Sequence, residues 1–466
     1  MVFSSISFIF FFLSVFFLGY YLLRGKWRIG FLLLASLIFY SWGELKYLPL
    51  MLIVIAINYL FALFVERFST HKRLFLILAV TIDLMSLLFY KYFTPLAVNV
   101  LRLPKLGFFP TSLPLGISFF TFQAMSYVID VYRGKTKAQK NLIVFGTYIT
   151  MFPQLIAGPI VRYSDIETQI NGLANRTQRI SLDAVEKGIQ MFLIGLAKKV
   201  LLGNMIGEAW QFLSVRPAEL GILGCWFGAF CYTLQIYYDF SGYSDMAIGL
   251  GGMMGFSFPK NFDHPYAATS VTDFWRRWHM TLSGFFRDYV YFPLGGSRKG
   301  TLRTILNMLI VWALTGLWHG ASATFVVWGL FYWMFLVLER FVFRRALEKI
   351  PAVIRTILLF LLVSASWMIF YFDNFPAMGR YFSGMFNFSA PILGTNAISV
   401  IGSYWVWFLM GLLCAGYLPS KAYHALARKK PVLASVCCTV ALLLLFVLCI
   451  AALVRQSYNP FIYFRF

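Results

Sequence analysis

The chain has 466 residues, of which 60% are hydrophobic and only 12% are charged, a balance that excludes a water-soluble globular fold and indicates an integral membrane protein. Lysine and arginine outnumber aspartate and glutamate by 40 to 18, which gives a formal net charge of +22. The cations lie in short loops between apolar runs, so we attribute them to the positive-inside rule and expect no nucleic acid partner.

Apolar runs that are long enough to cross a lipid bilayer as helices recur along the whole chain. The sequence predicts spans at Phe3–Leu23, Ile29–Trp42, Tyr47–Val65, Leu74–Phe93, Leu113–Val131, Leu142–Ile160, Val185–Met205, Leu220–Phe240, Ile305–Leu317, Thr324–Leu338, Ile354–Tyr371, Val400–Leu418 and Pro431–Val454. Two or three of these runs are short or interrupted by glycine or proline, and we expect them to be re-entrant. The pattern predicts an all-α polytopic membrane protein with about 11 transmembrane helices plus re-entrant and interfacial helices.

The positions of the basic residues predict the orientation of the chain. Cations follow the first, third and fifth runs, at 24–28, 67–73 and 133–140, and recur at 340–349 and 421–430. Because short cytoplasmic loops carry the excess of lysine and arginine, the N-terminus is predicted outside. No small-residue cleavage site precedes Arg24, so we interpret the first run as a retained helix rather than a signal peptide.

The polar residues divide the chain into three parts of a single membrane domain, 1–466. Residues 1–110 contain few polar side chains within their spans and are interpreted as scaffold helices. Residues 111–340 contain most of the polar and small residues and form the expected catalytic core. Residues 341–466 are expected to add C-terminal helices. All six cysteines lie in or beside apolar runs, and no spacing typical of a metal site occurs, so we expect no bound metal.

The first polar segment of the core is Tyr237–Asp245, in which Ser241 and Gly242 separate two acids and several glycines follow. We expect the helix to break here, because irregular backbone at membrane depth occurs where protein or a water-filled cavity surrounds it. Ion pairs between the acids Asp239, Asp245 and Asp288 and nearby arginines are expected to hold the broken helices together.

The second polar segment, 272–289, has helical periodicity. Its polar stripe is Thr272, Arg276, His279, Ser283 and Arg287, and its aromatic stripe includes Trp275 and Trp278. The pattern predicts one amphipathic helix. It is consistent with a helix at the membrane interface, with arginines among the headgroups, and equally with the lining of an internal passage.

The third segment combines a basic turn with a long apolar hairpin. Pro293 and two glycines precede Arg298 and Lys299, and the run from Arg303 to Arg340 follows, with His319 near its midpoint. If both ends of this hairpin lie on the cytoplasmic side, His319 would lie roughly 24 Å from the cytoplasmic end of its helix. Arginines of the core, with Arg298 and Lys299, are candidates to bind the phosphate groups of a cytoplasmic substrate. The preference of basic residues for the cytoplasmic side of the membrane explains these cations nearly as well.

His319 is the residue that most suggests chemistry. An ionisable side chain within an apolar hairpin is a candidate functional group, and the small residues Thr315, Gly316, Ser322 and Ala323 predict a cavity beside its ring. An imidazole can deprotonate a hydroxyl for attack on an acyl carbonyl. No Gly-x-Ser-x-Gly elbow is present, so direct attack by the acceptor is simpler than an acyl-enzyme. The alternative is a structural histidine that bonds a neighbouring helix.

Several segments of the chain together form a family pattern. They are 113–123, 152–160, Tyr238–Ile248, Phe274–His279, Phe286–Tyr289, Pro293–Gly296 and Leu314–Ser322, with the ending Tyr458–Phe466. In these segments the chain resembles the membrane-bound O-acyltransferase superfamily, in particular its bacterial alginate O-acetyltransferase branch. Trp-His-Gly in a hairpin together with Trp-Arg-Arg-Trp-His upstream is a specific pair of signals.

The resemblance implies an O-acyltransferase with a central tunnel, in which His319 is the essential histidine and His279 the second. Acetyl-CoA or another acyl thioester would be the donor, with no permanently bound cofactor. The acceptor would be an extracytoplasmic polysaccharide or cell-wall glycan, reached directly or through an extracytoplasmic acetyltransferase-like partner. The implied location is a bacterial inner membrane, with the lipid bilayer around the chain. Candidate substrate-binding residues are Trp275, Arg276, Arg287, Asp288, Asp245, Ser241, Asn307 and Trp318.

Three alternatives remain open from the sequence. A sister branch of the family moves D-alanine from a carrier protein to teichoic acid. A transporter or flippase would also tolerate a charged central block, although no internal repeat is visible. A non-enzymatic scaffold of an export complex would tolerate loss of His319. His279 has two interpretations as well: a role in the reaction path, for example in stabilising the oxyanion, or a structural polar residue.

Overall fold

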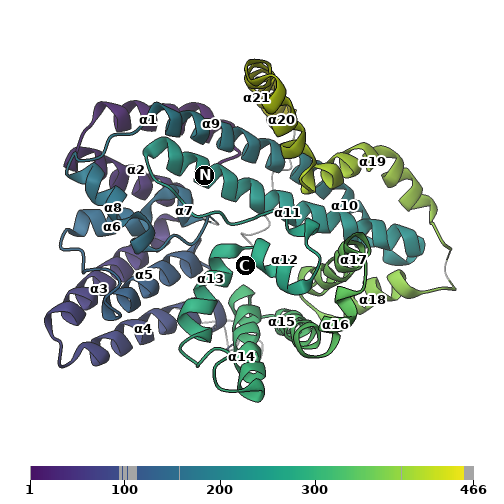
Figure 1. The fold of residues 1–466 in the computed structure, drawn as a ribbon, viewed down its shortest axis with the longest axis horizontal. Coiled ribbons are helices and arrows are strands. Elements are labelled where there is room, and N and C mark those ends of the chain that lie inside the picture. Colours follow the sequence, from purple (N-terminus) through teal and green to yellow (C-terminus); the bar gives the residue numbers. More distant parts are fainter. Residues whose placement is uncertain are drawn as a thin grey trace. The chain divides into compact units, whose positions relative to one another are not determined.

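The computed structural model describes residues 2–93, 97, 102, 113–156, 158–389 and 391–455, and all regular secondary structure in this part of the chain is helical (Figure 1). The all-α expectation is therefore confirmed. Contacts group the chain into two compact units, Met1–Phe192 with Tyr243–Lys260 and Leu193–Gly242 with Asn261–Phe466. The matching segment Tyr458–Phe466 and residue Ala157 lie outside the described residues.

The first unit consists of the N-terminal helices and the end of α11. Its helices are α1 (Leu13–Leu22), α2 (Lys26–Glu44), α3 (Leu48–Arg67), α4 (Lys72–Leu88), α5 (Ile117–Tyr132), α6 (Leu142–Thr150), α7 (Phe152–Leu155), α8 (Tyr163–Ala174) and the beginning of α9 (Leu182–Ala197). Inside it, Asn58 of α3 donates a hydrogen bond of 2.9 Å to the buried Asp83 carboxylate of α4. This bond gives each of the two buried polar side chains a partner within the apolar scaffold.

The second unit contains most of the polar core. Its helices are α10 (Met205–Val215), most of α11 (Gly221–Met254), α12 (Val271–Arg277), α13 (Met280–Phe286), α14 (Thr301–His319), α15 (Ala323–Leu338), α16 (Arg344–Glu348), α17 (Ala352–Tyr371), α18 (Phe375–Phe386), α19 (Thr395–Ala415), α20 (Leu418–Lys429) and α21 (Pro431–Arg455). A π-helical segment, Lys198–Asn204, joins α9 to α10, and shorter ones follow α13 and α15.

Eight helical segments within the described residues are long and apolar enough to cross a membrane, and one of them, Lys26–Arg67, contains two of the predicted spans. The predicted spans near α14, α15, α17, α19 and α21 agree with these helices to within a few residues. Two predicted spans were too long. The span predicted at Leu113–Val131 corresponds to α5, which has 16 residues, and the span predicted at Leu142–Ile160 contains α6, which has 9. Helices of that length are shorter than the roughly 20 residues that a bilayer requires.

The helix break predicted at Ser241–Gly242 is wrong, because α11 continues without interruption through 34 residues. The glycines instead allow close helix packing. In the first unit a Cβ at Gly249 would collide with the Gly188 carbonyl of α9, and in the second a Cβ at Gly242 would collide with that of Gly195. Small residues that let backbones approach are typical of membrane helix contacts. Tertiary packing therefore stabilises a helix that the local sequence disfavours.

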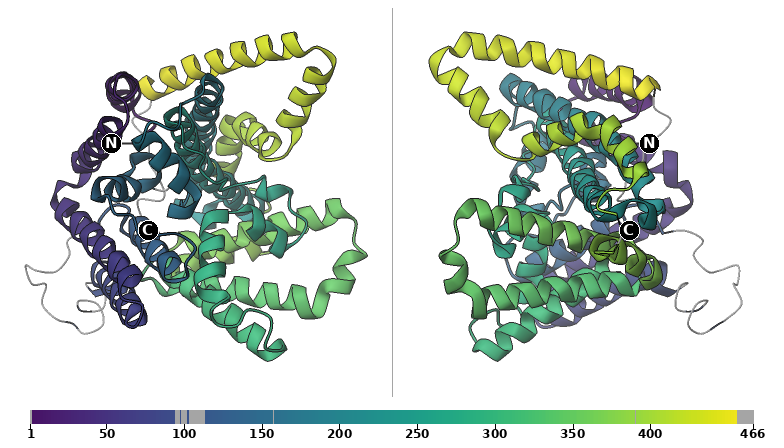
Figure 2. Two further views of the ribbon diagram at one scale, coloured as in Figure 1. Left: turned by 60° about the vertical axis from the view of Figure 1, so that its left-hand side comes forward. Right: turned by 90° about the vertical axis from the view of Figure 1, so that its right-hand side faces the viewer.

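The predicted hairpin is formed by α14 and α15, which run antiparallel and side by side (Figures 1 and 2). A Cβ at Gly316 would meet the Phe325 carbonyl, and one at Gly329 would meet the Trp312 carbonyl. The tip of the hairpin is the turn between His319 and Ala323, where Ser322 accepts a hydrogen bond from the amide of Thr324. His319 is thus the last residue of its helix and lies at this tip.

We expect Gly329→Ala to destabilise the protein by about 1–3 kcal/mol, because the added methyl group has no room beside the Trp312 carbonyl. Thermal unfolding of the purified protein measures the effect. The matched control is Gly402→Ala in α19, where the added Cβ has no atom within 4 Å, and the lost backbone freedom should be neutral or stabilising. Equal melting temperatures for the two variants would contradict the close contact.

Candidate active site

Aromatic rings surround the His319 imidazole. Trp318, Trp328 and Phe370 lie edge to face with it at centroid distances of 4.8, 5.2 and 4.9 Å, and Phe325 lies 6.2 Å away. His319 is 6% exposed. The cavity predicted beside this ring rested on one helix continuing through Ser322 and Ala323, but α14 ends at His319, Ser322 caps α15 and Ala323 begins it. From far along the chain, α17 brings Phe370 against the ring.

His279 lies in the turn between α12 and α13, not within a single amphipathic helix. Its backbone has φ 43° and ψ 53°, in the left-handed region, and Trp278 before it is extended. The prediction of one helix over 272–289 is therefore wrong. The cause is Asn261, whose carbonyl accepts from Met280 N–H at 2.9 Å, while its side-chain oxygen accepts from Thr281 N–H. These bonds replace those that a continuous helix would make.

Trp318 connects the two histidines. Its ring centroid lies 4.8 Å from that of His319 and 6.0 Å from that of His279. Phe240 of α11 packs against the other side of the site, with its centroid 4.7 Å from His279 and the rings perpendicular. His279 is 2% exposed, and burial lowers the pKa of its imidazole to about 3, so the ring is neutral at physiological pH. The structure thus brings together the two histidines that the sequence selected.

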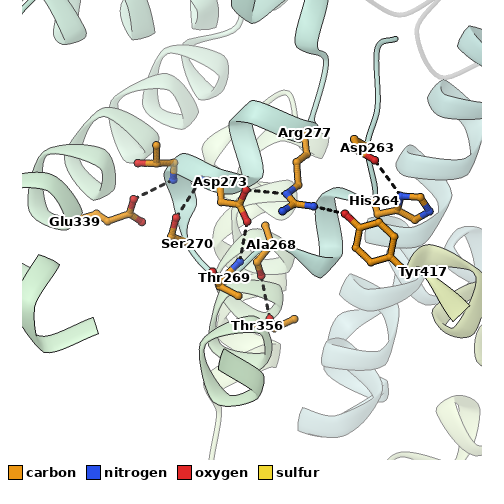
Figure 3. A network of polar contacts seen from close by, with 11 residues as sticks. Asp263, His264, Ala268, Thr269, Ser270, Asp273, Arg277, Glu339, Thr356 and Tyr417 are labelled. Carbon is orange, nitrogen blue, oxygen red and sulfur yellow. Dashed lines mark hydrogen bonds and ion pairs between the residues drawn. The ribbon is translucent and has the colours of Figure 1, made fainter. Parts of the chain in front are cut away.

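A polar network fixes α12 immediately before His279 (Figure 3). The Glu339 carboxylate accepts from the amides of Val271 and Thr272 at 2.6 and 3.1 Å, at the positive end of the helix. Asp273 pairs with Arg277 at 2.8 Å, and Arg277 also donates to the Tyr417 hydroxyl. Since Arg277 is held by these partners, the exposed Arg276 is the freer of the two to meet a charged ligand.

The other predicted aromatic residue, Trp275, belongs to a cluster next to His319. Its ring lies 4.7 Å from Trp312 and 5.6 Å from Trp328, and Trp328 in turn packs against His319. Trp275 therefore supports the aromatic wall of the site.

Asn307 holds the basic turn against α14. Its amide donates to the carbonyls of Leu294 and Gly296 at 3.3 and 2.9 Å, so this candidate substrate-binding residue satisfies backbone groups of the turn. Arg298 and Lys299, which follow in this turn, are exposed. Arg287 is also exposed and pairs with Asp288 at 2.8 Å.

The acids of α11 differ from the expectation. Asp239 is buried and pairs with Lys199, not with an arginine, and Lys199 also donates to Asn204 at 2.8 Å. Ser241 is buried and Asp245 half-buried in the same continuous helix, so the break on which their prediction rested is missing. Lys199 escaped the sequence analysis, although a lysine within an apolar run is itself a signal of a buried partner.

A separate cavity of about 400 Å³ lies in the first unit, near the beginning of α9 and the end of α11. Its lining includes Arg179, Ser181, Lys187, Gly252 and Phe256. Two basic side chains, Arg179 and Lys187, line this cavity, and none of the site residues predicted from the sequence does.

Comparison with known proteins identifies the family. The model of the MBOAT, membrane-bound O-acyltransferase family matches residues 37–372. The chain is 38% identical to the probable alginate O-acetylase AlgI of Pseudomonas putida, over 100% of both chains. It is 33% identical to the peptidoglycan O-acetyltransferase of Helicobacter pylori, over 86% of this chain and 81% of that protein. It is 30% identical to the teichoic acid D-alanyltransferase of Bacillus subtilis, over 47% of this chain and 56% of that protein. The chain belongs to the membrane-bound O-acyltransferase family and is a multi-pass membrane acyltransferase.

Proposed function

We propose that this protein transfers an acetyl group from a cytoplasmic thioester, acetyl-CoA, to a hydroxyl of an extracytoplasmic polysaccharide or cell-wall glycan. The observation that carries the proposal is the buried His319 at the tip of α14, in contact through Trp318 with a second buried histidine. Relatives named O-acetylase and O-acetyltransferase, similar over most or all of the chain, support acetyl as the group.

In the proposed reaction His319 acts as a general base. It takes the proton of the acceptor hydroxyl, whose oxygen then attacks the carbonyl carbon of the thioester. A C–O ester bond forms and the C–S bond breaks, while the imidazolium returns its proton to the departing thiolate. The chain's own contribution is to bury the imidazole among aromatic rings, which excludes water that would hydrolyse the donor.

The proposed topology places the N-terminus outside and Thr301 near the cytoplasm of a bacterial inner membrane. His319 ends a 19-residue helix that begins at Thr301, so it lies about 27 Å along the helix axis from that end. An acceptor would then approach from the outer side, and the thioester arm of the donor would reach inward. A partner protein outside the membrane would complete transfer to the polymer.

The test is an acyl-transfer assay with the protein in lipid vesicles, acetyl-labelled acetyl-CoA and a panel of glycan acceptors. The proposal predicts alkali-labile acetyl ester on a glycan, and flux of unmodified glycan without ester would instead indicate a transporter. Transfer of D-alanine from a carrier protein to teichoic acid is the second candidate, favoured by the Bacillus subtilis relative. Activity only with that donor and acceptor would replace acetyl transfer as the assignment.

We expect removal of both charges in Arg298→Gln/Lys299→Gln to raise the KM for acetyl-CoA about tenfold with kcat little changed, because the exposed cations would bind donor phosphates. Steady-state kinetics with the donor varied measure this. The control is Arg179→Gln/Lys187→Gln in the cavity of the first unit, which removes the same charge. An unchanged KM in the first variant would refute the donor role, and a raised KM only in the second would move the donor to the cavity.

A further inference from the structure

The hydrogen bonds around Asn261 define which atom of its side chain faces His279. Thr281 N–H and the Thr281 hydroxyl both lie within bonding distance of Asn261 Oδ1, at 3.3 and 2.9 Å. A backbone N–H can only donate, so the atom it meets is the amide oxygen and not the NH₂ group. Asn261 is 1% exposed, and its backbone carbonyl is held by Met280 N–H. The orientation of this amide is therefore fixed by the turn itself.

The same oxygen lies 3.1 Å from His279 Nδ1. An amide oxygen accepts hydrogen bonds and cannot donate, so the bond requires a proton on Nδ1. We infer that Asn261 is a positioning residue that holds His279 as the neutral Nδ1–H tautomer, so that Nε2 presents a lone pair to the reaction. Burial favours the neutral ring, and it lowers the pKa of His279 to about 3, which argues against an imidazolium with protons on both nitrogens.

This inference deepens the proposed function and rests on it for its chemical meaning. A neutral His279 with its lone pair on Nε2 accepts a hydrogen bond from a second hydroxyl of the sugar acceptor, which leaves the proton of the reacting hydroxyl to His319 and orients that hydroxyl toward it. Because Nε2 carries no proton in this tautomer, His279 cannot donate a hydrogen bond to an oxyanion. The inference therefore excludes the oxyanion-stabilising role that the sequence left open for His279. The left-handed backbone at His279, which the Asn261 bonds maintain, is the local strain that accompanies this arrangement.

The tautomer is measured directly by solid-state NMR of the full-length protein in lipid bilayers, with ¹⁵N-labelled histidine rings. The chain has five histidines, and loss of one set of signals in His279→Gln assigns the ring. The expected result is a protonated Nδ1 and an unprotonated Nε2, the opposite of the tautomer that free histidine prefers. A protonated Nε2, in either the neutral or the charged ring, would overturn the inference.

Three variants connect the tautomer to turnover. Asn261→Ala removes the oxygen that accepts from His279 Nδ1–H. The ring should then populate the Nε2–H tautomer as well, and kcat should fall about 100-fold or more. Asn261→Asp retains an acceptor oxygen and should keep the Nδ1–H tautomer and a kcat within about tenfold of the wild type. Thr281→Val removes another bond to the same oxygen and should leave the tautomer and kcat within about threefold, because His279 keeps its partner.

Asn58→Ala is the matched control for loss of a buried, hydrogen-bonded asparagine, and kcat per folded protein should not change. If Asn261→Ala and Asn261→Asp lose kcat equally, or if Thr281→Val loses as much as Asn261→Ala, the residue is only structural and the inference fails. If the wild type shows the Nδ1–H tautomer but no acyl transfer with any tested acceptor, the proposed function fails while the tautomer assignment stands.

Discussion

Replacement of His319 by alanine is expected to lower acyl transfer by about 100-fold to 10,000-fold, because the reaction loses its general base. The imidazole is the buried titratable group at the tip of the α14–α15 hairpin, and the rings around it are apolar. Water that enters the emptied space would be a poor substitute base at neutral pH. The measurement is the initial rate of labelled acetyl transfer by equal amounts of folded protein in vesicles.

Two further variants separate chemistry from folding. His319→Gln fills most of the space with another polar side chain, and it should be as inactive as the alanine variant although its melting temperature stays close to that of the wild type. His424→Ala removes an exposed histidine of α20 and should retain full activity. Wild-type rates in either His319 variant would show that the ring is a structural histidine and that another group acts as the base.

The second large effect is expected at the buried pair of Lys199 and Asp239. Lys199→Ala should destabilise the protein by about 3–5 kcal/mol, because it leaves the Asp239 carboxylate buried without its cation. Asp239 precedes Phe240, which packs on His279, so loosening this turn of α11 should also lower activity. Thermal unfolding of the purified protein and residual activity after heating give the two readouts.

The double variant Lys199→Met/Asp239→Leu replaces both charges by apolar groups and should recover most of the lost stability, since neither charge of this pair remains buried. As a control, the pair of Arg344 and Glu348 has side chains 78% and 64% exposed, and Arg344→Ala should change stability by less than about 1 kcal/mol. If Lys199→Ala is as mild as the control, or if the double variant is less stable than the single one, the electrostatic explanation is wrong.

The long apolar helices followed from the sequence because the signal for them is local. The hairpin of α14 and α15 and the helices α17, α19 and α21 begin and end within a few residues of the predicted runs. A continuous stretch of apolar residues is enough to specify a helix that faces lipid. The selection of His319 also needed only the sequence, because an ionisable residue at membrane depth is rare without a role, and the selection of His279 followed from the resemblance to the O-acyltransferase superfamily.

Contacts between distant segments decided the rest. Gly242 and Gly249 predict a broken helix by themselves, and only the approach of α9 makes them part of a continuous one. The pattern over 272–289 predicts one helix, and only Asn261, from outside that segment, turns the chain at His279.

The surroundings of the two histidines depend on the same kind of contact. Phe370 completes the aromatic wall of His319 from α17, and Lys199 pairs with an acid that lies 40 positions further along the chain. The sequence by itself determined the helices and the two imidazoles, because hydrophobicity and ionisation belong to single residues. The tertiary structure determined the turn, the aromatic wall and the partner of each charge, because these depend on which segments pack together.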